Sequence, residues 1–152
     1  MTAFFVSRER DLAADSTAIR DLLDDFRKWL AWSPWEHTGL CVDRRYFGAP
    51  SGAGAEYTWR SHEPRLGSGS MKIVDSTQER VELALEHFEP LAAHSAITFA
   101  LVAAEAGTRL TWAMTGKTGN PTMSRAGYAR FVAKREIELE HGLDLLQQIV
   151  EV

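Results

Sequence analysis

An α+β fold with one antiparallel sheet and one long helix is the architecture that the sequence predicts. Apolar residues alternate with polar residues in six segments between Cys41 and Gly116, which is the pattern of strands with one buried face. Short connections, such as those at 75–78 and 106–108, favour pairing of neighbouring strands as antiparallel hairpins. The segment 122–150 instead repeats its apolar residues with a helical period. Together these observations indicate two layers, a sheet and a helix.

The N-terminal part is expected to hold one strand followed by short helices. Residues 3–11 alternate loosely and predict a first strand. Asp15 or Ser16 is a suitable N-cap for a helical segment that extends to Trp32. One face of this segment carries apolar residues at helical spacing, namely Ile19, Leu22, Leu23, Phe26 and Leu30. Pro34 ends the pattern, and the Asp24-Asp25 pair inside it predicts a break into two short helices.

The alternating segments predict six further strands, for a sheet of six to seven strands in all. They cover residues 41–47, 54–62, 70–76, 80–90, 94–105 and 107–116. A sheet of this size twists and tends to curl. The helix over 122–150 would be about 40 Å long at 1.5 Å per residue, against about 33 Å for a ten-residue strand. It can therefore lie across the whole apolar face of the sheet.

Composition and charge exclude several classes of function. The chain has 152 residues, which suits one domain over 1–152, and a net charge of -4. This charge gives no indication of nucleic-acid binding. Cys41 is the only cysteine, so no internal disulfide and no cysteine-based zinc motif can form. No apolar stretch is long enough for a membrane span, and the N-terminal residues do not resemble a signal peptide. A cytoplasmic protein is expected, whose oligomeric state the sequence leaves open.

Several motifs resemble those of a known superfamily. They are WSPWE at 32–36, YFGAPSGAGAEYTW at 46–59, GSGSMKIVDS at 67–76, FEPLAAHSAITFAL at 88–101, GTRLTWAMTG at 107–116 and GLDLL at 142–146. With these motifs the chain resembles the SRPBCC superfamily, whose helix-grip fold is shared by START lipid-transfer domains, the major birch pollen allergen and polyketide cyclases. Its bacterial polyketide-cyclase-like branch is the most similar. The resemblance implies a curved sheet that wraps around a long C-terminal helix, with a deep apolar cavity between them for hydrophobic small molecules.

The side chains expected to line such a cavity are large aromatic residues and flexible methionines, a mixture that suits an adaptable apolar site. Most of them lie at inward positions of the predicted strands and helix, and two flank the Ser33-Pro34 turn at the expected mouth. The predicted ligand-binding residues are Trp32, Trp35, Tyr57, Trp59, Met71, Leu85, Phe99, Trp112, Met114 and Phe131.

Three ionisable residues are weak candidates for chemistry. Glu36 follows the two tryptophans of the turn, where it could anchor a ligand. His87 alternates inward on a strand, and with Glu89 and His94 it forms the arrangement most similar to a metal site. Because Glu89 and His94 are only five residues apart, at a hairpin end that is expected to be exposed, no metal and no cofactor is expected. Arg135 interrupts the apolar stripe of the long helix, and a charge there needs a partner or a role.

Three hypotheses of function follow from these residues. Binding of a hydrophobic small molecule is favoured, because it requires only apolar walls and one or two polar anchors. A cyclase- or hydratase-like enzyme is the first alternative, but an enzyme needs an ionisable pair within reach of one reacting atom, and the sequence shows no unambiguous pair. A module that binds a segment of a partner protein in the same groove is the second alternative.

Overall fold

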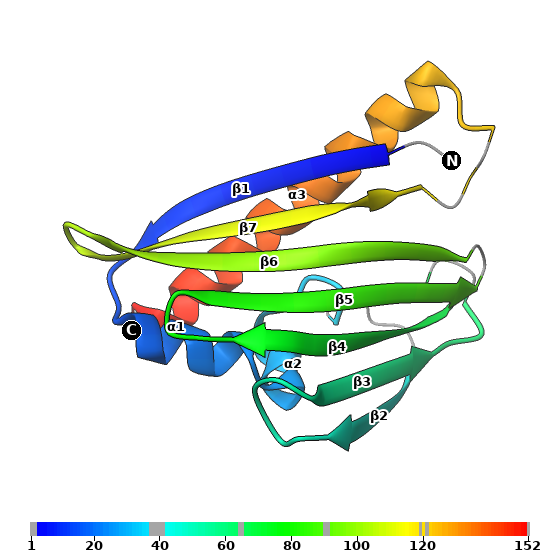
Figure 1. The fold of residues 1–152 in the computed structure, drawn as a ribbon. Helices are drawn as coiled ribbons and strands as arrows, with labels where there is room; N and C mark the ends of the chain where they lie inside the picture. Colours follow the sequence, from blue (N-terminus) through cyan, green and yellow to red (C-terminus); the bar gives the residue numbers. More distant parts are fainter. Residues whose placement is uncertain are drawn as a thin grey trace.

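The computed structural model describes residues 3–36, 42–63, 66–89, 92–118, 120 and 122–151. In these residues seven antiparallel strands form one sheet, in the order β1-β7-β6-β5-β4-β3-β2 (Figure 1). The strands are β1 (Ala3–Leu12), β2 (Asp43–Gly48), β3 (Ala55–Arg60), β4 (Ser68–Ser76), β5 (Arg80–Glu89), β6 (Ala93–Ala104) and β7 (Gly107–Lys117). The helices are α1 (Ser16–Leu23), the short 3-10 helix η1 (Phe26–Lys28), α2 (Trp29–Trp32) and α3 (Arg125–Val150).

The long helix α3 crosses one face of the sheet diagonally, and its C-terminal end lies beside α1 (Figure 1). Arginines of β1 hold this strand to α3: Arg10 contacts Glu140 and Asp144 at 2.8 Å each, and Arg8 pairs with Glu136. The predicted α+β architecture is thus confirmed, with the first strand completing the sheet at the side of β7. Within the described ranges, no helix is both long and apolar enough to cross a membrane.

The alternation of the strands places their apolar side chains on the face that α3 covers. Across β6 and β7, Phe99 pairs with Trp112 and Ile97 with Met114, and all four side chains are buried. The turn from β2 to β3 depends on glycine, as its sequence suggests. Gly48 has a φ of 71°, and a Cβ there would lie 2.1 Å from the carbonyl oxygen of Gly54.

The segment between β1 and β2 differs in detail from the predicted helical face. The helix ends at Leu23, and after Asp24 the chain turns into η1, where the Asp25 side chain accepts a hydrogen bond from the Arg27 N–H at 3.0 Å. This break changes which residues face the sheet. Trp29, which lies off the predicted apolar face, is only 1% exposed, whereas Leu30, predicted to lie on that face, is 46% exposed.

Candidate functional site

A cavity of ≈ 400 Å³ lies between the sheet and α3. Its size falls in the range of about 300–1,000 Å³ that is typical of small-molecule sites. The wall is built from the turn after α2, from inward positions of five strands and from one stretch of α3. The residues that line it are Pro34, Trp35, Glu36, Val42, Arg44, Tyr57, Trp59, Leu66, Met71, Leu85, His87, Met114, Lys134, Arg135 and Glu138.

The apolar wall is centred on Trp59 of β3. Its indole Nε1 donates a hydrogen bond to the Leu66 carbonyl at 3.0 Å, and its ring meets the His87 ring edge to face at a centroid distance of 5.6 Å. Gly69 pairs with Trp59 across β3 and β4, and a Cβ there would lie 2.4 Å from Cη2 of the indole. The glycine therefore leaves the space in which the indole lies over β4.

A buried polar cluster stands at the β2–β3 side of the cavity. The Glu36 carboxylate accepts a hydrogen bond from Arg44 Nε at 2.5 Å and another from the Tyr57 hydroxyl at 2.8 Å, and its side chain is only 7% exposed. Burial, and then the Glu36 charge, raise the pKa of Tyr57, so its hydroxyl stays protonated. Burial alone would lower the pKa of Arg44, but the hydrogen bond and charge of Glu36 raise it. Arg44 is thus held in its charged form.

A second set of polar side chains comes from α3 and β5. Arg135 Nη1 donates a hydrogen bond to Glu138 Oε1 at 2.5 Å, one helical turn away, and the guanidinium lies 4.9 Å from the centroid of the Phe131 ring. The charge that interrupts the apolar stripe of α3 therefore has a carboxylate partner. Burial, together with the nearby Arg135 charge, lowers the pKa of His87. His87 is therefore neutral at pH 7.

The depressed pKa of His87 predicts a loss of stability in mild acid. The unfolded chain takes up the proton near its ordinary pKa of about 6.5, whereas the folded chain resists it to lower pH. His87 therefore contributes stability above about pH 6.5 that is lost as pH falls toward its folded pKa. Urea denaturation at pH 7 and pH 5 should show a smaller loss in His87→Gln than in the wild type. His141→Gln, at an exposed position of α3, should match the wild type, and an equal loss in all three proteins would contradict the assignment.

The structure places the predicted ligand-binding residues in three different surroundings. Those in the cavity wall are Trp35, Tyr57, Trp59, Met71, Leu85 and Met114. Trp32, Phe99 and Trp112 lie instead in a fully buried aromatic cluster with Trp29. Phe131 packs against Phe4 at a centroid distance of 5.0 Å. The three candidates for chemistry, Glu36, His87 and Arg135, all line the same cavity.

Charged residues that the sequence analysis did not single out complete the wall. Arg44 stands at an inward position of β2, in register with Trp59, and a charge at such a position is itself a signal of a buried partner. Glu138 follows Arg135 at the i,i+3 spacing of a helical ion pair. Lys134 precedes Arg135 directly and had no distinguishing pattern in the sequence.

The histidines near the β5–β6 hairpin do not share a site. His87 lines the cavity, whereas His94 lies on the opposite face of the sheet, where its side chain is 81% exposed and Nδ1 contacts Glu86 at 3.4 Å. The two rings therefore cannot bind one ion. Within the part of the chain that the structure describes, no three acidic, histidine or cysteine side chains are close enough to hold a metal. Cys41 lies outside the described residues.

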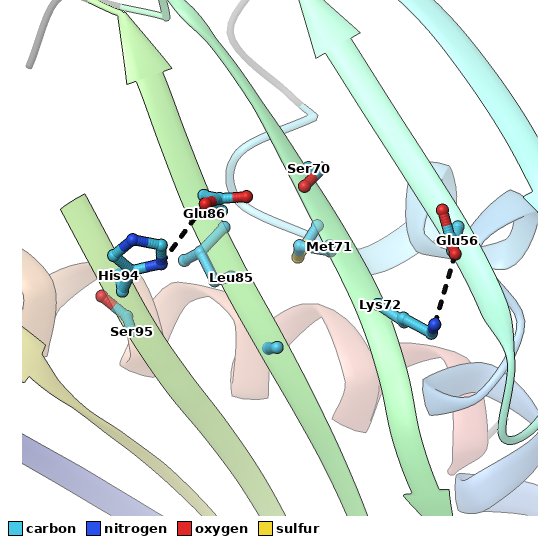
Figure 2. Close-up of a pocket in the computed structure, with 9 residues that line it drawn as sticks. Glu56, Ser70, Met71, Lys72, Leu85, Glu86, His94 and Ser95 are labelled. Carbon is cyan, nitrogen blue, oxygen red and sulfur yellow. Dashed lines mark ion pairs between the residues drawn. The ribbon is translucent and has the colours of Figure 1, made fainter. Parts of the chain in front are cut away.

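A smaller hollow of ≈ 290 Å³ lies on the exposed face of the sheet, over β3 to β6 (Figure 2). Its charged side chains pair with one another: Lys72 Nζ lies 3.4 Å from Glu56 Oε1, and His94 pairs with Glu86. Figure 2 shows these two ion pairs on either side of Ser70. Because its wall holds no tryptophan, tyrosine or phenylalanine among the described residues, this hollow is a weaker candidate site than the cavity under α3.

No protein-family model and no curated protein matches the sequence. Solved structures match it over nearly its full length. CV1439 from Chromobacterium violaceum has a TM-score of 0.71 and 14% identity, covering 97% of each chain. Ara h 8.0201 has a TM-score of 0.66 and 10% identity, again over 97% of each chain. DynU16, from the dynemicin biosynthetic locus, has a TM-score of 0.63 and 15% identity over 97% of this chain and 47% of its own. The chain therefore has the helix-grip fold that its resemblance to the SRPBCC superfamily predicts.

Proposed function

We propose that this protein binds a hydrophobic small molecule in the cavity between the sheet and α3. The observation that carries the proposal is the composition of the cavity wall. Trp59, Met71, Leu85 and Met114 supply apolar and aromatic surface, while a few fixed polar groups stand at its sides. This combination of an apolar wall and few oriented polar groups is typical of small-molecule sites. The likeness in fold to DynU16, from the dynemicin biosynthetic locus, supports a link with small organic molecules.

The geometry favours binding over the cyclase-like alternative. Glu36 is the most buried acid of the wall, but its two oxygens already accept hydrogen bonds from Arg44 and Tyr57. Each carboxylate oxygen is thus occupied by a protein donor, so neither faces a substrate without competition from Arg44 or Tyr57. Glu36 therefore serves as a structural anchor of the wall. In an enzyme at this site, His87 would be the general base. That role would require a substrate to bind first in this same cavity.

Filling the cavity should weaken binding without unfolding the protein. The uncharged dye N-phenyl-1-naphthylamine, which fluoresces in apolar surroundings, is expected to bind the wild type saturably. Leu85→Trp places a larger side chain in the cavity wall and should weaken binding at least about tenfold, at a cost in stability of about 1–3 kcal/mol. Ala84→Trp is the matched control, because Ala84 is the neighbouring residue on the same strand and lies on the exposed face.

The control should bind the dye as the wild type does, and thermal unfolding should show that both variants are folded at the temperature of the titration. Failure of the wild type to bind the dye, or unchanged binding by Leu85→Trp, would contradict the proposed function.

A further inference from the structure

The charge of the cavity wall has the opposite sign to the charge of the chain. The chain carries a net charge of -4. The wall contains three basic side chains, Arg44, Lys134 and Arg135, but two carboxylates, Glu36 and Glu138. His87 adds no negative charge to this set. A ligand in the cavity therefore meets a positive surface in a protein that is acidic as a whole.

Both carboxylates of the wall are already engaged by protein groups. Glu36 accepts hydrogen bonds from Arg44 at 2.5 Å and from Tyr57 at 2.8 Å. Glu138 accepts one from Arg135 at 2.5 Å. A ligand that carried a positive charge would have to break one of these pairs to find a partner, and it would also lie among three cations.

Lys134 is the basic residue of the wall whose charge has no carboxylate partner among the described residues. Arg44 and Arg135 are paired with Glu36 and Glu138, whereas Lys134 forms no ion pair or hydrogen bond with any residue that the structure describes. Its side chain is exposed and is one of those that line the cavity. His87, which also lines the cavity, is likewise without a hydrogen-bond partner among the described residues, so its ring nitrogens are open to a ligand.

We propose, resting on the proposed function, that the ligand is an organic anion whose acidic group binds Lys134 while its apolar body lies against Trp59, Met71, Leu85 and Met114. A hydrogen bond from an ammonium to a carboxylate is stronger than one between neutral groups. A neutral ligand would gain nothing comparable from Lys134. The unpaired charge of Lys134 thus favours the binding of an acid over that of a neutral ligand of similar shape.

Two competitors of nearly the same shape separate charge from size. 1-Naphthylacetate and the uncharged 1-naphthylacetamide are each titrated against bound N-phenyl-1-naphthylamine at pH 7.5 and low salt. The wild type is expected to bind the acetate roughly tenfold more tightly than the amide, the effect of one charge-assisted hydrogen bond. Salt should reduce this preference, because Lys134 is exposed.

Lys134→Gln should reduce the preference for the acetate over the amide to roughly twofold. Lys28→Gln removes the same charge at an exposed position outside the cavity, and it should retain the wild-type preference. Equal binding of the two competitors by the wild type, or the same preference in Lys134→Gln and Lys28→Gln, would overturn this inference while leaving the proposed function in place. If the dye does not bind the wild type, the proposed function itself fails.

Discussion

Replacing Arg44 with methionine is expected to lower the free energy of unfolding by about 3 kcal/mol, the lower end of what breaking a buried ion pair costs. The reason is the position of its partner. The Glu36 side chain is 7% exposed, and Arg44 is the cation within 4.0 Å of it among the described residues. Methionine keeps most of the length of the arginine stem but leaves the carboxylate with the Tyr57 hydroxyl alone. Urea denaturation at pH 7 measures the loss.

Two further variants show whether the loss comes from the uncompensated charge. Adding Glu36→Gln to Arg44→Met removes that charge, and the double variant should regain all but about 1 kcal/mol, because buried pairs replaced on both sides are often close to neutral. Arg45→Met changes the next residue of β2, whose side chain is 70% exposed, and it should stay within about 0.5 kcal/mol of the wild type. If Arg44→Met lowers the free energy of unfolding no more than Arg45→Met does, the ion pair between Glu36 and Arg44 contributes little to stability.

The fold could be predicted almost completely from the sequence, because alternation and helical period are local signals. All seven strands and the long helix lie within a few residues of their predicted bounds. The helical segment before β2 was less accurate for a physical reason. The sequence predicts the break at Asp24 and Asp25, but the predicted apolar face continues one helical period across it, whereas the turn there changes the direction in which the following residues point. Trp29 thereby turns inward and Leu30 outward.

The candidate site was harder to predict from the sequence. The alternation of apolar and polar residues along a strand shows which face of the strand is buried, but not which element packs against that face. Trp59 and Trp112 both point inward. Trp112 meets α3 directly at Gly142, where a Cβ would lie 2.5 Å from its Cζ3, and Trp32 covers it from the other side. Trp59 instead lines the cavity. The difference depends on how closely α2 and α3 approach each strand, which is a property of the tertiary packing alone.

Replacing Trp112 with alanine is expected to lower the free energy of unfolding by about 4 kcal/mol, in the range for large buried aromatic side chains. The side chain is fully buried and packs against Trp32, Trp35 and Phe99. Its removal opens a space between β7 and α3 that rigid neighbouring rings cannot fill. Thermal and urea unfolding should both report the loss, and a loss below about 2 kcal/mol would mean that the cluster collapses into the space.

A matched pair of phenylalanine variants separates the volume of these indoles from their hydrogen bonds. Trp32 and Trp112 are both fully buried. Trp32 Nε1 donates a hydrogen bond to the Leu22 carbonyl at 2.8 Å, whereas Trp112 Nε1 has no partner among the described residues. Trp32→Phe loses volume and a hydrogen bond, while Trp112→Phe loses volume and also removes an unpaired buried donor. Trp32→Phe should therefore cost at least about 1 kcal/mol more than Trp112→Phe. Equal costs would mean that the Trp112 N–H is satisfied in solution, and a water molecule in the cluster would then be its partner.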